Sequence, residues 1–150
     1  MLNRRSFLMR TIAVSAGALL LQPLRAMAAW NEKAFKATDL NSAMTELLGG
    51  ADAEASDAIQ LSAPDIAENG AVVQVSVATD MADVESISLY VEKNPSPLAA
   101  QFNMSEGMSA DVTTRIKMRS TSNLIAVVKA GGKLYSTQKE VKVTIGGCGG

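Results

Sequence analysis

The sequence predicts an all-β protein: an immunoglobulin-like antiparallel β-sandwich of about seven strands, preceded by a short N-terminal helix and ending in a flexible glycine-rich arm. From residue 57 onward, apolar and polar residues alternate with a period of two, which is typical of half-buried strands. Turn residues interrupt this pattern about every 8–12 residues, as in a sandwich. We therefore expect a leader over residues 1–28, a sandwich domain over 29–145 and an arm over 146–150.

The leader has the features of a twin-arginine (Tat) signal peptide. Arg4 and Arg5 precede the apolar stretch TIAVSAGALLL, and small residues at 26–28 predict cleavage after Ala28. The stretch is shorter than the about 20 apolar residues of a transmembrane helix. We therefore expect export in the folded state to the periplasm and no membrane attachment after cleavage. An ordinary Sec signal is the alternative.

One helix is predicted at about 38–48, within a helical region at 30–50. Leu40, Ala43, Met44 and Leu47 follow the spacing of one buried helix face. Thr38 or Asn41 is expected to cap its start. Gly49 stands where a glycine commonly ends a helix.

Seven segments then have the alternation of strands. Gly131-Gly132 predicts a tight hairpin between the last two segments, and Asn69-Gly70 and the run NPSP at 94–97 predict further turns. The predicted strands are AIQLSAP, AVVQVSVATD, VESISLYVEKN, LAAQFNM, DVTTRIKMRS, NLIAVVKA and KLYSTQKEVKVTI.

Composition excludes several classes of site. The whole chain has a net charge of −1, and removal of the four basic residues of the leader brings it to −5. With this charge, no basic stripe and few aromatic residues, nucleic acid is not an expected ligand. The chain has no histidine, which excludes histidine-based metal sites and His-dependent catalysis, so we expect neither a metal nor a cofactor. Its single cysteine cannot form an intramolecular disulfide.

Two patterns resemble chemical motifs but are better explained by structure. The tetrad STQK at 136–139 matches the S-x-x-K pattern of serine acyl-enzymes, yet it falls in a predicted strand and lacks the companion motifs. Met104 and Met108 could suggest a soft copper site, but they flank a predicted turn, and packing or exposure explains them better.

The last five residues, GGCGG, are the strongest functional signal. Cys148 stands between the pairs Gly146-Gly147 and Gly149-Gly150, and an odd exposed thiol in an exported protein indicates intermolecular pairing or a reactive group. Glycine has no Cβ, so the segment is thin and adopts many conformations. Five extended residues reach at most about 17 Å, enough to carry a sulfur through a narrow channel.

This thiol has no activating group of its own within the motif. An unperturbed cysteine has a pKa of about 8.5 and is only a few per cent thiolate at pH 7. No histidine is present to act as a base. The pattern therefore indicates a covalent carrier with a swinging arm rather than an enzyme.

The segments VKVTIGGCGG, AENGAVV, VEKNPSPLAA and TRIKM closely resemble the SoxY family, the sulfur-carrier subunits of the bacterial Sox thiosulfate-oxidising system. The resemblance covers essentially all of residues 29–150. It implies a heterodimer with a SoxZ-type subunit and sulfur intermediates carried on Cys148. It also implies a c-type cytochrome pair that attaches thiosulfate, a dimanganese hydrolase that releases sulfate and, in some organisms, a sulfane dehydrogenase.

Two other functions remain open at this point. One is a structural or adhesive sandwich domain that dimerises through a Cys148 disulfide. The other is a thiocarboxylate carrier ending in Gly-Gly, which would need ATP-dependent activation and a β-grasp fold.

Overall fold

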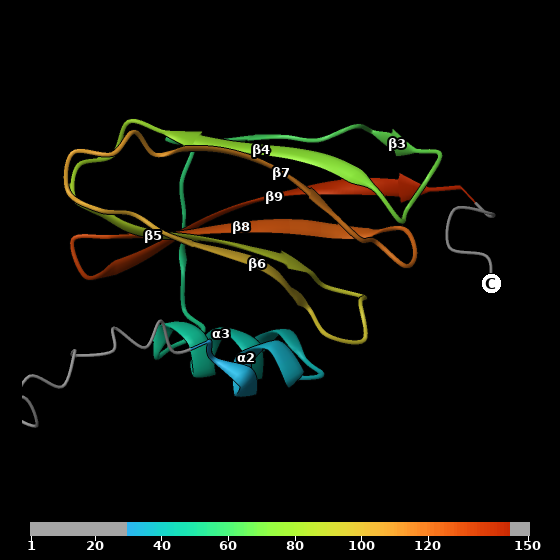
Figure 1. Ribbon diagram of the computed structural model, residues 1–150, viewed down its shortest axis with the longest axis horizontal. Helices are drawn as coiled ribbons and strands as arrows, with labels where there is room; N and C mark the ends of the chain where they lie inside the picture. The colour runs from blue at the N-terminus through green and yellow to red at the C-terminus, as the bar shows by residue number, and fades with distance from the viewer. Residues whose placement is uncertain (1–29, 145–150) are drawn as a thin grey trace, which may run out of the picture. The chain divides into compact units, whose positions relative to one another are not determined.

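The computed structural model describes residues 30–144 and confirms the predicted fold class, a two-sheet β-sandwich preceded by helix (Figure 1). The leader and the GGCGG segment lie outside these residues, so the predicted domain division stays a prediction there. The helices are α2 (Glu32–Lys36) and α3 (Leu40–Leu48). The strands are β1 (Glu54–Ala55), β2 (Ile59–Ser62), β3 (Ile66–Ala67), β4 (Val73–Thr79), β5 (Val84–Val91), β6 (Leu98–Asn103), β7 (Asp111–Ile116), β8 (Ser122–Ala130) and β9 (Lys133–Val143).

The strands form a six-stranded and a three-stranded sheet. The larger sheet has the order β1-β9-β8-β5-β6, with β3 also paired to β9, and the smaller has the order β2-β4-β7. Each of the seven predicted segments contains one of the longer strands, β2 and β4 to β9, except that β8 begins one residue before its segment, at Ser122. The two-residue strands β1 and β3 were not predicted, and both pair with β9 in parallel. Two residues are too few to show a periodicity, and their partners lie about 80 residues away in sequence.

Apolar residues at alternate positions form the core between the sheets. Val73, Val75 and Val77 of β4 are at most 1% exposed, and they pack with Ile87 and Leu89 of β5. This packing follows from the period-two pattern, which puts every second side chain on one face of a strand.

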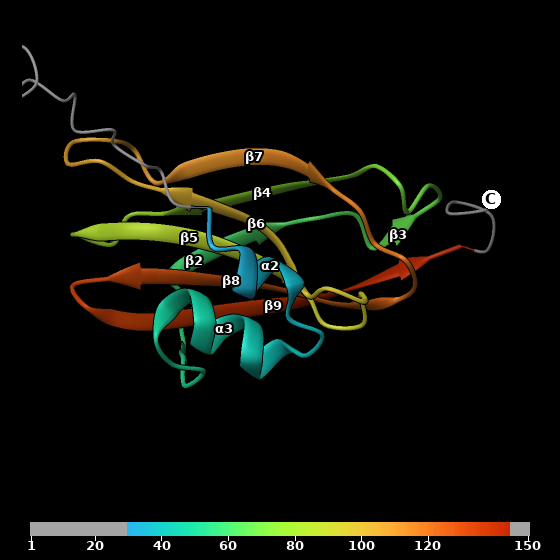
Figure 2. The same cartoon turned by 60° about the horizontal axis from the view of Figure 1, so that its bottom comes forward.

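The other face of the large sheet is also buried, because the helices cover it (Figure 2). Ala34 and Met44 of the helices pack against Tyr90 and Val127 of the sheet. The protein therefore has three layers, and β5 is buried on both faces over most of its length. Polar residues of this strand, such as Ser88, are enclosed rather than solvated.

Two helices occupy the region where one was predicted, and the predicted cap was wrong. Asp39, rather than Thr38 or Asn41, caps α3: its carboxylate accepts a hydrogen bond from Ser42 N at 2.9 Å. Asp39 has the extended backbone that an N-cap needs, whereas Asn41 is already inside the helix. Gly49 ends α3 with φ 82°, as predicted.

The predicted hairpin between β8 and β9 is confirmed. Ala130 pairs with Lys133, and Gly131 and Gly132 have φ of 55° and 75°. Positive φ at both central residues is characteristic of a type I′ turn, which favours glycine.

Replacement of Tyr90 by Phe should leave the free energy of unfolding unchanged or raise it by up to ~1 kcal/mol. The Tyr90 and Ser88 hydroxyls are buried and have no hydrogen-bond partner among residues 30–144, so deleting one removes a desolvated polar group. Urea unfolding measures this, with Tyr90→Ala as the control that should lose about 3–5 kcal/mol. If Tyr90→Phe lowered the free energy of unfolding by more than 1 kcal/mol, the Tyr90 hydroxyl would have a hydrogen-bond partner.

The stability of the Tyr90→Phe variant should also depend on pH differently from that of the wild type. Burial raises the pKa of Tyr90 to about 12. Between about pH 10 and 12, the native state therefore keeps the phenolic proton of Tyr90, whereas the unfolded chain loses it. The contribution of the protonated group to the free energy of unfolding is complete below about pH 10 and is lost as the pH rises from 10 to 12. Over that range the melting temperature of Tyr90→Phe should fall less than that of the wild type.

Candidate functional site

The predicted site residues lie outside the described part of the chain. These are Cys148, Gly146, Gly147, Gly149 and Gly150, and the same holds for Arg4 and Arg5 of the leader. What the structure does describe is the segment from which the predicted arm departs. We call Val141–Thr144, at the end of β9, the arm root.

Hydrogen bonds hold the arm root on both sides. On one edge of β9, Thr144 N donates to Ala67 O at 3.1 Å, and Lys142 N donates to Asp65 O at 3.0 Å. On the other edge, Val143 N donates to Thr121 Oγ1 at 3.0 Å. Because strands and side chains bind both edges, the backbone is fixed as far as Thr144, four residues before Cys148.

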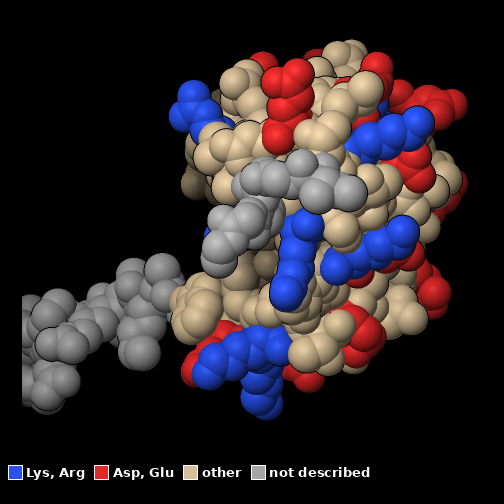
Figure 3. Space-filling model, turned by 90° about the vertical axis from the view of Figure 1, so that its right-hand side faces the viewer, with Lys and Arg blue, Asp and Glu red and all other residues tan. Residues whose placement is uncertain are grey.

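The side chain of Asn94 ties two loops together next to this root. Its Nδ2 donates to Lys117 O at 2.7 Å, and its Oδ1 accepts from Arg119 N at 2.9 Å. The turn at 94–97 was predicted, but this bridge was not. A side-chain amide carries both a donor and an acceptor, and that is the only signal in the sequence that could have suggested it. Figure 3 views the protein from this end.

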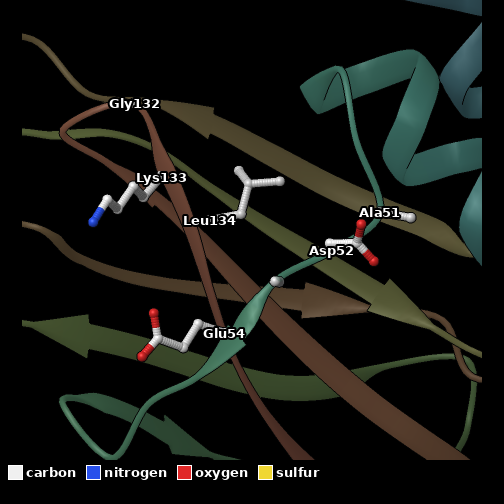
Figure 4. Close-up of a pocket in the computed structure, with 7 residues that line it drawn as sticks. Ala51, Asp52, Glu54, Gly132, Lys133 and Leu134 are labelled. Atoms are coloured by element: carbon white, nitrogen blue, oxygen red, sulfur yellow. The ribbon is translucent and has the colours of Figure 1, made fainter.

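A groove on the protein lies at the opposite end of β9 (Figure 4). Its volume is about 720 Å³, and the Lys133 and Glu54 side chains extend from neighbouring strands toward the same side. The eleven residues of β9 span about 33 Å, whereas the four residues from Thr144 to Cys148 reach at most about 14 Å. This groove is therefore out of reach of Cys148. It is lined by Ala51, Asp52, Ala53, Glu54, Gly132, Lys133 and Leu134.

The STQK tetrad at 136–139 and the pair Met104 and Met108, which resemble chemical motifs, have structural explanations. Ser136 and Lys139 lie three residues apart on β9, so their side chains project from opposite faces of the strand. Lys139 Nζ instead donates to Ala63 O at 2.6 Å and to Asp65 Oδ1 at 2.9 Å. The hydrogen bond between Lys139 and the Asp65 carboxylate lowers the pKa of Asp65. Met104 packs against the core, whereas Met108 is 59% exposed.

Among residues 30–144, no group of three or more His, Cys, Asp or Glu side chains could hold a metal ion. Within the same residues, no helix is long and apolar enough to cross a membrane.

Comparisons with known proteins identify a family and a fold. The family model described as sulfur oxidation protein SoxY matches residues 44–148. The solved structure of the sulfur carrier protein SoxY from Chlorobium limicola f thiosulfatophilum is 45% identical, covers 77% of this chain and 100% of that chain, and has a TM-score of 0.65. No curated protein sequence matches the chain.

A more distant likeness shows the fold alone. Two solved structures of superoxide reductase (neelaredoxin) from Ignicoccus hospitalis, each of a different variant, both have a TM-score of 0.52. The first is 21% identical and covers 57% of this chain and 79% of its own. The second is 19% identical and covers 67% of this chain and 89% of its own.

Replacement of Thr121 by Val should loosen the arm root without unfolding the protein. It removes the acceptor of Val143 N, a bond of about 0.5–1.5 kcal/mol. Amide hydrogen exchange at Val143 should become about 3- to 10-fold faster. Thr113→Val is the matched control, because its hydroxyl binds Ser76 on the smaller sheet. Equal exchange in both variants would contradict the assigned role of Thr121.

Proposed function

The chain belongs to the SoxY family of sulfur oxidation proteins, and we propose from this premise that it is a periplasmic sulfur carrier that holds thiosulfate-derived intermediates on Cys148. The observation that carries the proposal is the fixed arm root, which ends four residues before the only cysteine of the chain. The family match, which extends to residue 148, also supports it.

The division of labour follows from the chemistry of the thiol. With no histidine in the chain, the conversion of Cys148 to its thiolate and the removal of electrons fall to other proteins. The body holds the arm root still, and Gly146 and Gly147 let the thiol turn away from the body into a recessed active site. The chain is thus a substrate rather than a catalyst.

The proposed cycle uses the partners implied by the resemblance. With a SoxZ-type subunit bound, a c-type cytochrome pair takes two electrons as the sulfane sulfur of thiosulfate joins Cys148 Sγ, and the thiol proton is released. A dimanganese hydrolase then adds water to the terminal sulfonate, which leaves as sulfate and protons and leaves a persulfide on Cys148. In organisms that have a sulfane dehydrogenase, this enzyme oxidises the remaining sulfur.

Cys148→Ser should abolish sulfur loading while changing the free energy of unfolding by less than about 0.5 kcal/mol, as expected for a surface substitution. Intact-mass spectrometry of protein from the native periplasm should find adducts of ~32 and ~112 Da on the wild type, the masses of sulfane sulfur and thiosulfonate increments. The serine variant should carry neither. A doubled mass under non-reducing conditions, without adducts, would instead support the disulfide-linked dimer.

The glycines should matter separately from the thiol. Gly146→Val combined with Gly147→Val should sharply slow thiosulfate-dependent cytochrome reduction with purified partners, because side chains widen the arm and restrict its backbone. Labelling of Cys148 by iodoacetamide should stay nearly unchanged, which separates access to the enzymes from the reactivity of the thiol. Loading at the wild-type rate would show that the glycines are not required.

Export is proposed to follow the Tat pathway. Replacement of both Arg4 and Arg5 by Lys should leave the precursor in the cytoplasm, because the twin arginines are the recognised feature of such leaders. Cell fractionation and N-terminal sequencing measure this, with a mature terminus expected at Ala29. Continued export of the double variant would support a Sec signal instead.

A further inference from the structure

Met108 is the exposed methionine of the described chain. Its side chain is 59% exposed, whereas Met44 and Met118 are buried. The remaining methionines of residues 30–144, Met81 and Met104, are half-buried against the core between the sheets. Small reagents therefore reach the Met108 thioether directly, while a buried sulfur becomes accessible only when the surrounding structure opens.

A tight turn fixes the position of the Met108 side chain. Met108 N donates to Ser105 O at 3.1 Å, and Gly107 has φ 82°, as the third residue of a type II turn requires. The side chain folds back over the start of this turn, where Ser105 N donates to Met108 Sδ at 3.4 Å. The sulfur is thus exposed to solvent and, at the same time, oriented by a hydrogen bond from the backbone.

Met108 also lines a cavity between the β4–β5 connection and the connection from β6 to β7. The volume of this cavity is about 300 Å³, far more than the ~30 Å³ that a water molecule occupies in the liquid. Asp80, Asp83 and Glu106 line it as well, so the cavity carries negative charge. A small neutral oxidant, such as hydrogen peroxide, enters it more easily than an anionic oxidant, because like charges repel.

We propose that Met108 is a reversible modification site for peroxide, and that the fold directs the oxygen to one of the two lone pairs of its sulfur. A sulfur lone pair attacks one peroxide oxygen, the S–O bond forms, the O–O bond breaks, and the second oxygen leaves as water. The thioether gives two electrons to the peroxide and becomes a sulfoxide, which a methionine sulfoxide reductase can reverse. Met108 belongs to neither apolar cluster of the described chain, so this change leaves the core intact.

The hydrogen bond from Ser105 decides which lone pair reacts. Addition to each lone pair gives a different sulfoxide epimer. An oxygen added on the side of Ser105 would shorten the 3.4 Å gap by more than about 1 Å, to less than the ~2.7 Å lower limit of an N–H···O hydrogen bond. The other lone pair meets no such obstacle. One epimer therefore predominates in the native protein, by about threefold for a weak hydrogen bond of this kind.

The experiment oxidises the mature protein with hydrogen peroxide, in buffer and in urea, and requires no Sox enzyme. Cys148 is first capped with iodoacetamide, because a thiol also reacts with peroxide. The protein is then digested, and the Met108 peptide is treated with each of the two sulfoxide reductases, which reduce one epimer each. Mass spectrometry measures the fraction that each enzyme reduces and the rate at which every methionine is oxidised.

In buffer, Met108 should be oxidised first, at least about tenfold faster than Met118, since a buried sulfur reacts only after the core opens. Its epimer ratio should be about 3:1 in buffer and close to 1:1 in urea, where the turn is lost. Faster oxidation of Met81 or Met104 than of Met108 would overturn the proposal. Equal epimer yields in buffer and in urea would overturn it as well.

Two variants at one position test the role of the backbone donor. Ser105→Pro removes the N–H and should bring the ratio in buffer close to 1:1. Ser105→Ala is the matched control, because it keeps the N–H and changes only the side chain, and its ratio should equal that of the wild type. An equal loss of the bias in both variants would contradict the role of the backbone donor. The comparison of buffer with urea needs no variant and decides the matter if Ser105→Pro does not fold.

Discussion

The structure depends on the pairing of β9 along both of its edges. β8 pairs with one edge over almost the full strand, and β1 and β3 pair with parts of the other. A strand at the margin of a sheet would leave backbone donors and acceptors open, and its end could fray. Here the last hydrogen bonds at the end of β9, to Ala67 and Thr121, hold the arm root. A rigid base therefore meets the glycine-rich segment within a few residues.

In the proposed carrier, stability and function would reside in different parts of the chain. The two apolar clusters hold the sheets and helices together, and Tyr90 is the one titratable residue among the core members of residues 30–144. The predicted carrier thiol, Cys148, lies outside the residues that the structure describes. If the cargo is carried on Cys148, as proposed, loading and unloading would leave the core unchanged, and the body would be the same for every partner.

Surface charge serves a different purpose from the core. Exposed charges contribute little to stability, so their distribution can follow function. Lys139 has a structural role, since it joins β9 to Ala63 and Asp65 beside β3.

The sequence by itself determined the sandwich class, the seven longer strands and the glycine turn at 131–132, and it predicts the carrier thiol. These features depend on local periodicity, on backbone preferences and on a motif of five residues. Only the tertiary structure decided that helices cover the second face of the large sheet, that β3 pairs with the arm root, and that Asn94 bridges two loops. Each of these depends on contacts between residues far apart in sequence, which leave no periodic signal. The sequence around Ser88, for example, does not show whether its side chain is buried or exposed.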